Sequence, residues 1–419
     1  MADSGESRTS EQVPVSHHQH PMTIVMGCDT FPPNINGAAN FAERLAAGLV
    51  QRGHNVHIVA PAVSRKHGTW VEEHRGAPMT VHRLRSWRWY PHEWLRFALP
   101  WTSKWNARRV LDEVKPDVVH IQSHIVIGRG LSYEAHKRGI PIVATNHIMP
   151  ENMIEFTLVP KFLHKTFIRI AWNDARKSFD LARAVTTPTE RAARFLREAT
   201  GVNDVLAVSC GIDTDNYTPS FAPRTQNRIL FVGRVTAEKQ IDVLIKAVAA
   251  LDPELDAHLD IVGTGDQTKN LQALVARLGL AGRVRFSGFV TDEELRALYT
   301  QATVFAMPSI AELQSIATME AMSSALPVVA ADAMALPHLV HDGRNGYLFA
   351  PGDVRDCAEK LERVLRLPDD EFTAMKHASL DIVASHAIER TITTFENLYS
   401  GEPVTDSVTD PITIATEKE

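Results

Sequence analysis

The chain alternates between short apolar segments and longer segments of helical length, and this alternation runs twice. Buried parallel strands read as continuous apolar runs, and helices usually connect them. The pattern therefore predicts an α/β fold with parallel sheets that carry helices on both faces. The expected strands are 23–27, 55–60, 117–121, 140–145 and 184–187 in the first series, and 229–232, 259–262, 284–286, 303–305 and 327–330 in the second.

A polar stretch with Pro219 and Pro223 separates the two series and is the best candidate for a linker. A chain of 419 residues is also too long for one ordinary core. We therefore expect two Rossmann-like, doubly wound lobes that face each other across a cleft. The expected units are a disordered tail at 1–20, a first lobe at 21–213, a second lobe at 214–385, a helix at 386–400 that returns to the first lobe, and a disordered tail at 401–419.

The overall composition narrows the possible classes. A net charge of −6 argues against general affinity for nucleic acid. Cys28, Cys210 and Cys357 are an odd number without paired spacing, which excludes a closed disulfide framework and favours a reducing compartment. Residues 1–20 contain no apolar segment typical of a secretory signal, and no apolar run approaches the ~20 residues that span a bilayer.

Glycine and two cations follow the first strand of the second series. Gly233 allows a ligand to approach the turn, while Arg234 and Lys239 supply fixed positive charge without a metal. The alternative is a surface turn with solvated charges. Gly263 lies in a second turn of the same lobe, where a nucleotide-lining role and a structural role are equally supported.

Glu312 and Glu320 stand in a loop and in the helix that follows it. Carboxylates bind sugar hydroxyls, and the backbone amides at the start of a helix bind anions. This combination suits a phosphorylated ligand with many hydroxyl groups, so we interpret the pair as part of a nucleotide-sugar site.

In the first lobe, Gly37 lies between a strand and a helix, where it would allow backbone amides near a diphosphate. Gly211 ends this lobe beside the linker, where a ligand-binding turn and a structural turn are equally plausible. His120, His124 and His147 follow two strand ends and are candidates for substrate binding or proton transfer, with buried structural histidines as the alternative. They lack a carboxylate partner at ligand spacing, so we predict no metal site.

Five of the seven tryptophans, Trp87, Trp89, Trp94, Trp101 and Trp105, gather among cations between Arg83 and Arg109. Residues 161–177 repeat the pattern with Phe162, Phe167, Ile168, Ile170 and Trp172. Aromatic rings among cations are typical of contact with an anionic membrane, and each cation contributes about 1 kcal/mol there. The alternative is that these aromatics pack the core.

Taken together, these motifs resemble the retaining glycosyltransferases of family 4, which have the GT-B fold. The resemblance rests on the Pro-Pro…Asn-Gly loop before residue 38, Gly-Ile-Asp at 211–213, Gly-Arg…Glu-Lys at 233–239 and the paired glutamates. It covers residues 23 to about 400. Segments 145–152 and 312–315 look like the branch that glycosylates diacylglycerol-type lipids. More narrowly, the chain resembles actinobacterial GDP-mannose-dependent α-mannosyltransferases of glycolipid and lipoglycan synthesis.

The resemblance implies roles for individual residues. Arg234 and Lys239 would grip the donor diphosphate, Glu312 would hold hydroxyls of the donor sugar, and Glu320 would hold the ribose. His124 lies near the position of the family's active-site histidine, although His120 competes for it. Where the family has Gly-Phe-Gly, this chain has Leu313-Gln314-Ser315, so we expect only the backbone amides of this segment and Ile316 to serve the donor.

The expected activity is transfer of an α-hexosyl unit, mannosyl from GDP-mannose, to a membrane glycolipid, with retention and without a strict metal requirement. No Asp-x-Asp motif is suitably placed, and the donor is a substrate, so no cofactor is predicted. The enzyme would lie in the cytoplasm, peripherally on the inner face of the plasma membrane. Alternatives are transfer to a soluble acceptor, a nucleotide-sugar epimerase on the same scaffold, and a non-catalytic sugar-nucleotide-binding regulator.

Overall fold

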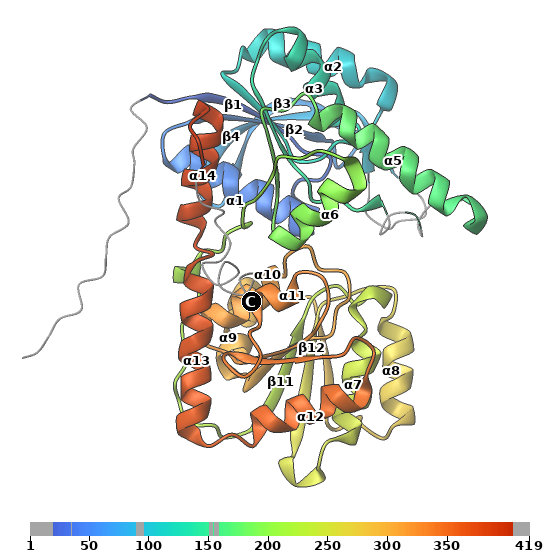
Figure 1. The fold of residues 1–419 in the computed structure, drawn as a ribbon, viewed down its shortest axis with the longest axis vertical. Helices are drawn as coiled ribbons and strands as arrows, with labels where there is room; N and C mark the ends of the chain where they lie inside the picture. Colours follow the sequence, from blue (N-terminus) through green and yellow to red (C-terminus); the bar gives the residue numbers. More distant parts are fainter. Residues whose placement is uncertain (1–19, 35, 89–95, 151–153, 155–158, 405–419) are drawn as a thin grey trace, which may run out of the picture.

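The computed structural model describes residues 20–34, 36–88, 96–150, 154 and 159–404, and this part of the chain forms two α/β lobes (Figure 1). Most of the two expected tails, together with Trp89, Trp94, Glu151 and Asn152, lies outside the described residues. Each lobe contains its own sheet of mainly parallel strands, with helices packed on it. The predicted α/β fold class is therefore confirmed.

The first lobe is built on a sheet with the order β10-β9-β8-β7-β1-β2-β4-β3. Its strands are β1 (Thr23–Gly27), β2 (Asn55–Pro61), β3 (Gly68–His74), β4 (Ala77–Leu84), β7 (Val118–Ile121), β8 (Ile142–Thr145), β9 (Ala184–Thr187) and β10 (Val205–Ala207). Neighbours are parallel except the edge pair β3–β4. The chain leaves β1 toward β2 and later returns to β7 on the other side of β1. The carboxyl ends of β1 and β7 therefore flank the switch point, where ligands bind in such sheets.

The second lobe repeats this design with a fully parallel sheet in the order β13-β12-β11-β14-β15-β16. Its strands are β11 (Asn227–Val232), β12 (Ala257–Val262), β13 (Val284–Gly288), β14 (Val304–Met307), β15 (Val328–Ala331) and β16 (Gly346–Phe349). The switch point of this lobe lies between β11 and β14. Residues that follow these two strands are consequently placed where a ligand would bind.

Helices cover both faces of each sheet. In the first lobe they are α1 (Gly37–Gln51), α2 (Ser103–Val114), α3 (Ile127–Lys137), α5 (His164–Phe179) and α6 (Glu190–Thr200), with a small hairpin of β5 (Ser86–Arg88) and β6 (Arg96–Ala98). In the second they are α7 (Ile241–Ala250), α8 (Thr268–Arg277), α9 (Asp292–Gln301), α10 (Ile316–Ser323), α11 (Leu336–Leu339), α12 (Val354–Leu365) and α13 (Asp369–Ala384). Helix α1 begins where the Asn36 side chain accepts a hydrogen bond from the Ala39 amide at 2.9 Å, which caps the helix.

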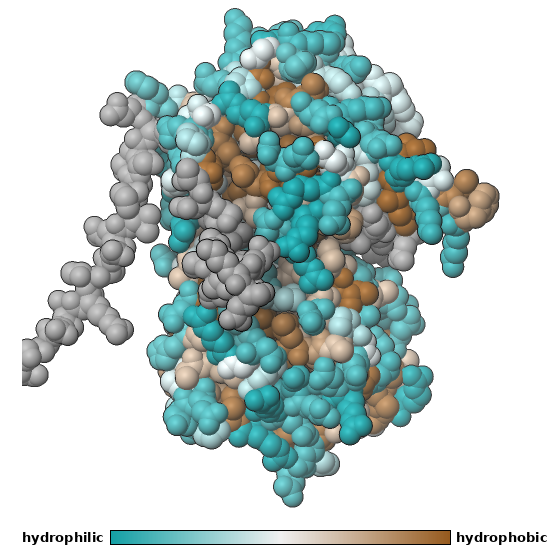
Figure 2. Space-filling view, viewed as in Figure 1, coloured by the Kyte–Doolittle hydropathy of each residue, from teal (hydrophilic) through white to brown (hydrophobic). Residues whose placement is uncertain are grey.

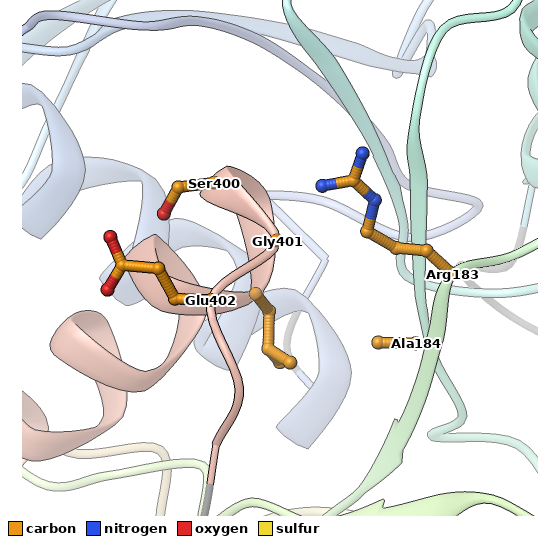
Figure 3. Close-up of a pocket in the computed structure, with 6 residues that line it drawn as sticks. Arg183, Ala184, Ser400, Gly401 and Glu402 are labelled. Atoms are coloured by element: carbon orange, nitrogen blue, oxygen red, sulfur yellow. The ribbon is translucent and has the colours of Figure 1, made fainter.

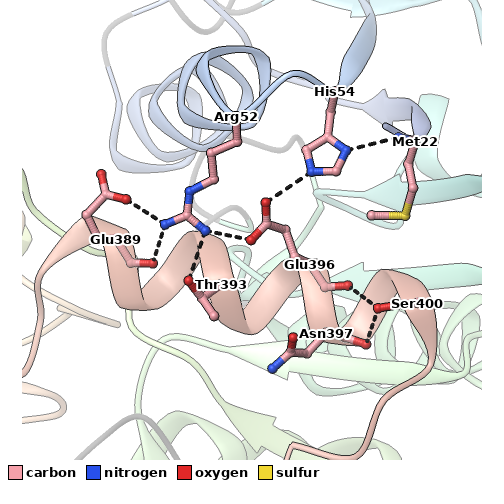
Figure 4. A network of polar contacts seen from close by, with 8 residues as sticks. All are labelled: Met22, Arg52, His54, Glu389, Thr393, Glu396, Asn397 and Ser400. Carbon is pink, nitrogen blue, oxygen red and sulfur yellow. Dashed lines mark hydrogen bonds and ion pairs between the residues drawn. The ribbon is translucent and has the colours of Figure 1, made fainter. Parts of the chain in front are cut away.

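The last helix, α14 (Ile388–Ser400), packs against the first lobe although it follows the second in sequence (Figure 1). Phe395 and Tyr399 are buried in the same core as α1. At the surface of this contact, the Arg52 guanidinium reaches Glu389 and Glu396, each at 2.5 Å, and His54 lies 3.0 Å from Glu396 (Figure 4). A buried core and a charged network thus hold α14 on the first lobe.

Candidate active site

The structure brings two of the predicted donor residues into contact at the switch point of the second lobe. Lys239 ends the loop after β11, and its ammonium forms an ion pair with the carboxylate of Glu312, in the loop after β14. The two side chains are only 13% and 10% exposed, and they come from positions 73 residues apart. The separation of the two residues along the sequence does not predict this contact. The contact depends on β11 and β14 being neighbours in the sheet.

Arg234 lies on the more open side of the same loop. Its guanidinium is 3.0 Å from the carboxylate of Glu238, and its side chain is 44% exposed. Both predicted cations therefore already have an acidic partner within their own lobe. A bound diphosphate has to share or replace these partners, so the loop offers exchangeable positive charge.

The glycines of the turn after β12 have a packing role. A Cβ atom on Gly263 would lie 1.9 Å from the carbonyl oxygen of Gly233, and one on Gly265 would lie 2.1 Å from that of Val235. The backbone of Val235 also donates a hydrogen bond to the Thr264 carbonyl at 2.9 Å. The two turns are therefore stacked backbone on backbone, which fixes the loop that carries Arg234 and Lys239. Donor contact by Gly263 stays a prediction.

The segment after Glu312 has two different roles. Among the described residues, no acceptor is assigned to the backbone amides of Leu313, Ser315 and Ile316. Their contact with an anion stays a prediction. The side chain of Gln314, in contrast, contacts the first lobe: its oxygen accepts from the Cys210 amide at 2.7 Å, and its nitrogen donates to the Ser209 hydroxyl at 3.0 Å. Sequence reasoning did not foresee that Gln314 joins the lobes.

Glu320 lies on α10 and accepts a hydrogen bond from the hydroxyl of the buried Tyr299 at 2.9 Å. Burial raises the pKa of this carboxyl, while hydrogen bonds from Tyr299 and Tyr217 and the charge of Arg44 lower it. Tyr217, Tyr299 and Arg44 were not singled out from the sequence. The tyrosines lie 82 residues apart, and nothing in their local sequence indicates a common partner.

In the first lobe, Gly37 opens α1, and a Cβ atom added there would meet nothing within 4 Å. The space beside it can therefore admit a ligand. Arg83, on β4, holds the loop that precedes Gly37. Its guanidinium donates to the Pro32 carbonyl at 2.7 Å and to the Glu72 carboxylate at 2.6 Å. Arg83 thus supports the loop at the switch point.

Gly211 has a positive φ of 65° and packs against Thr391 and Ile388 of α14, and donor contact there stays a prediction.

The histidines differ in their environments. His120 is fully buried, and its ring nitrogens lie 2.7 Å from the Tyr399 hydroxyl and 2.7 Å from the Thr145 hydroxyl. It is a structural residue of the core. His124 lies beside the rings of Trp172 and Phe179, its Nδ1 has no partner among the described residues, and burial lowers its pKa to about 4. Of these two, only His124 keeps an unbonded ring nitrogen, so its catalytic role stays a prediction.

His147 pairs with a residue that sequence reasoning missed. Its Nε2 lies 3.0 Å from the side-chain oxygen of Gln122, which follows β7, and its ring packs 4.8 Å from that of Phe41 on α1. Burial lowers the pKa of His147 to about 4. Since β7 flanks the switch point, Gln122 and His147 are further candidates for contact with an acceptor.

A shallow hollow lies at the end of the first sheet that is opposite the switch point, and the contacts of its residues are structural. It is lined by Arg183 and Ala184 at the start of β9 and by the residues that end α14 (Figure 3). Arg183 points toward the end of this helix and donates to the Tyr399 carbonyl at 3.1 Å. It satisfies a helix-terminal carbonyl and lies at the amino end of its strand, away from the switch point.

Exposed apolar side chains gather on one side of the first lobe, and brown atoms mark α5 in Figure 2. Trp101 is 66% exposed, and its ring lies 5.2 Å from that of Trp87. Phe162 is 82% exposed, just before α5. The exposed apolar residues of this surface are Trp87, Trp101, Trp105, Phe162, Leu163, Phe167 and Ile170.

Two residues predicted to belong to this surface, Trp172 and Arg83, are buried, and Ile168 is partly buried. Trp172 is 3% exposed and packs in the core, and Ile168 packs against the same core. Arg83 is 5% exposed and holds the Pro32 carbonyl instead. A helix such as α5 places successive aromatics on different faces, so a count of aromatics overstates what reaches the surface.

Among the described residues, no group of three or more histidine, cysteine, aspartate or glutamate side chains is arranged to hold a metal ion. Likewise, none of the described helices combines the length and apolar character needed to cross a membrane.

Solved structures share this two-lobed arrangement. The sucrose-phosphate synthase of Thermosynechococcus elongatus superposes with a TM-score of 0.75 over 91% of this chain and 98% of that one, at 17% identity. Anabaena HepE, solved in complex with UDP and glucose, gives a TM-score of 0.69 over 91% and 100%, at 19% identity. The fold is that of the two-lobed GT-B glycosyltransferases.

Family models match both lobes. Residues 35–216 match the model described as Glycosyltransferase Family 4, and residues 226–367 match Glycosyl transferases group 1. An MMP alpha-(1->4)-mannosyltransferase of Mycolicibacterium hassiacum is 31% identical over 65% of this chain and 68% of its own length. The chain therefore belongs to glycosyltransferase family 4.

Other relatives differ in the activities their names state. The GDP-mannose-dependent alpha-mannosyltransferase of Corynebacterium glutamicum is 26% identical over 81% of this chain and 79% of its own length. The sulfoquinovosyl transferase of Arabidopsis thaliana is 27% identical over 79% of this chain, which spans only 64% of that protein. The chain is thus a glycosyltransferase of this family. The names of its relatives state more than one transferred sugar.

Proposed function

We propose that this glycosyltransferase moves an α-mannosyl unit from GDP-mannose to a membrane glycolipid, such as a glycosylated diacylglycerol, with retention of configuration. The observation that carries the proposal is the contact between Lys239 and Glu312 at the switch point of the second lobe. A cation for the diphosphate and a carboxylate for the sugar hydroxyls stand side by side there. The mannosyltransferases among the relatives support the choice of donor.

The chemistry follows from charge. When the bond between the anomeric carbon and the diphosphate breaks, negative charge grows on the leaving phosphate, and Arg234, Lys239 and the amides of Leu313–Ile316 stabilise it. The acceptor hydroxyl attacks the same face of the sugar and passes its proton to the departing phosphate. Glu312 holds the sugar hydroxyls during this step. Positive side chains and amides take the role of a metal ion, so the reaction has no strict metal requirement.

The aromatic and cationic surface of the first lobe supports a lipid acceptor. The same segments of the sequence carry exposed cations, which include Arg85, Arg88, Lys104, Lys161 and Lys165. Amphipathic rings with surrounding cations bind the interface of an anionic bilayer. We therefore propose that the protein works at the cytoplasmic face of the plasma membrane, with this surface on the lipid.

The donor and acceptor are tested together. The full chain is incubated with GDP-mannose, UDP-glucose or ADP-glucose and vesicles that contain a glucosyl diacylglycerol, with and without EDTA. We expect an α-linked mannolipid from GDP-mannose alone, formed equally in EDTA. Transfer only to soluble sugars, conversion of the donor without an acceptor, a β-linked product, or activity abolished by EDTA would each contradict part of the proposal.

The membrane surface is tested separately. Phe162→Ser combined with Ile170→Ser should lower binding to phosphatidylglycerol vesicles at least tenfold, because two exposed apolar side chains of about 1.5 kcal/mol or more each no longer enter the interface. Val71→Ser, a 68% exposed position on β3, is the matched control and should bind like the parent. Equal sedimentation of the double variant with the vesicles would refute the membrane role of α5.

A further inference from the structure

The chain crosses between the two lobes twice, and the two crossing segments pair with each other. The first crossing follows β10, and the second lies between α13 and α14. The Ile212 amide donates to the His386 carbonyl at 2.8 Å, and the Ile212 carbonyl accepts from the Ile388 amide at 2.9 Å. A change in the angle between two lobes is absorbed by the segments that connect them. We therefore call residues 209–213 and 386–388 the hinge.

Ser209 is a fully buried residue at the start of the hinge, and its hydroxyl connects three parts of the molecule. The hydroxyl lies 3.0 Å from the side-chain nitrogen of Gln314, 3.1 Å from the Gly211 amide and 2.9 Å from Nδ1 of His386. A serine hydroxyl has two acceptor lone pairs and one proton. Gln314 and Gly211 fill the lone pairs, so the proton is donated to His386. Burial lowers the pKa of His386 to about 3, which leaves its ring neutral and able to accept.

The orientation of the Gln314 side chain follows from this network. The backbone amide of Cys210 can only donate, and it lies 2.7 Å from the Gln314 side-chain oxygen. The side-chain nitrogen therefore donates to Ser209. The hinge is itself anchored in the first lobe, because the Gly211 carbonyl accepts from the buried Arg44 of α1. Both polar ends of the Gln314 amide are thus bonded to fixed partners across the boundary between the lobes.

The segment that carries Gln314 is held from two sides. We call residues 309–316, which follow β14, the donor loop. On the side of the second lobe, the Ile310 amide donates to the Glu238 carbonyl at 3.0 Å. On the side of the first lobe, the hinge holds Gln314, and the Thr189 hydroxyl donates to the carbonyl of the preceding residue at 3.3 Å. The candidate donor groups of the loop lie between these two anchors.

We propose that Gln314 is a positioning residue for the donor, which couples the donor loop to the hinge. The inference rests on the proposed function, in which this loop binds the sugar nucleotide. With the Gln314 side chain bonded to the hinge, the loop is ordered before the donor arrives, so that donor binding does not carry the entropic cost of ordering it. A change in the lobe angle moves the hinge and, through Gln314, the donor loop. The affinity for the donor therefore depends on how the lobes are docked.

The test compares Gln314→Met with Thr391→Val in the full chain. Methionine keeps the length of the side chain but makes neither of the two hydrogen bonds. Thr391 is the matched control because it is also buried and donates to the Ser209 carbonyl at 3.0 Å, a bond to the hinge rather than to the donor loop. The readouts are KM and kcat for GDP-mannose well below the melting temperature, the melting temperature itself, and hydrogen exchange of the Ile310 amide without donor.

The expected result is a change in donor binding with little change in the step that follows. Gln314→Met should raise the donor KM about tenfold and change kcat less than about threefold, because the donor then has to order the loop. The Ile310 amide should exchange about tenfold faster than in the parent. Thr391→Val should lower the melting temperature to a similar degree, but it should keep the KM and the Ile310 exchange rate of the parent.

A double-mutant cycle with Ser209→Ala tests whether the two residues act together. Ser209→Ala removes the acceptor of the Gln314 nitrogen, so the variant with both changes should have a KM close to that of Gln314→Met alone. An unchanged KM or unchanged Ile310 exchange in Gln314→Met, or effects on KM that multiply fully in the double variant, would overturn the inference and leave Gln314 as a structural tether. If the parent shows no activity with GDP-mannose, the proposed function fails, and the Ile310 exchange rates still decide the coupling, so the two failures are distinguishable.

Discussion

Replacing Lys239 should separate the stability of the donor site from its activity. Lys239→Ala leaves the Glu312 carboxylate, whose side chain is 10% exposed, without its counter-ion. Removing one member of a nearly buried pair costs about 3 kcal/mol. The double variant Lys239→Ala/Glu312→Ala removes both charges and should recover most of this loss. We expect the single variant to melt roughly 5 °C or more below the parent and the double variant to melt close to it.

The double variant should recover the stability of the parent but not its activity. Loss of one charge that stabilises the leaving group lowers kcat about 10²–10³-fold, and the double variant should be at least as inactive as Lys239→Ala. Lys246→Ala is the control, since Lys246 forms a 2.7 Å ion pair with Asp242 in the same lobe but is 43% exposed. The assays are calorimetric melting and initial rates with GDP-mannose. Recovery of activity in the double variant, or unchanged melting of the single one, would refute the reasoning.

Two further predictions concern other parts of the molecule. Gly263→Ala should destabilise the protein by roughly 2 kcal/mol or more, because φ is +130° and the new Cβ would collide with the Gly233 carbonyl. The control is Gly282→Ala, whose Cβ meets nothing within 4 Å and which should leave the stability unchanged. The urea unfolding midpoints of both variants check this. His74 lies 3.0 Å from Glu43, which raises the pKa of this histidine. Its stabilising contribution is therefore present below about pH 6.5 and lost as pH rises through the raised pKa, and His74→Gln should flatten that dependence in melting curves.

The central strands could be predicted from the sequence because they are buried on both faces. β1 and β9 have the expected bounds, 23–27 and 184–187, and the other expected strands differ by a few residues. The edge hairpin of β3 and β4 was missed. Strand β3 is largely exposed and contains Glu72, Glu73 and His74, so it lacks a continuous apolar run. An edge strand of this kind carries little of the signal on which the prediction depends.

The site could be predicted only in part. Arg234, Lys239, Glu312 and Glu320 lie at the carboxyl ends of strands or in the helix that follows, which a pattern of strands and loops reveals. The role of Gln314 depends on how the two lobes meet, and that of Arg44 on how α1 meets the end of the first lobe. Such contacts join positions more than 100 residues apart, and no local pattern records them. The same reason explains why His120 and His124 could not be distinguished before their burial and partners were known.

The placement of α14 has a consequence for synthesis on the ribosome. The first lobe needs Phe395 and Tyr399 to complete its core, yet the whole second lobe is translated before these residues emerge. The first lobe therefore remains incomplete, with apolar surface exposed to solvent, while the second lobe is synthesised and folds. Closing a connection of this length is slow and leaves the waiting surface open to aggregation. Cells that make this protein should consequently benefit from chaperones that shield the nascent first lobe until the chain's last helix arrives.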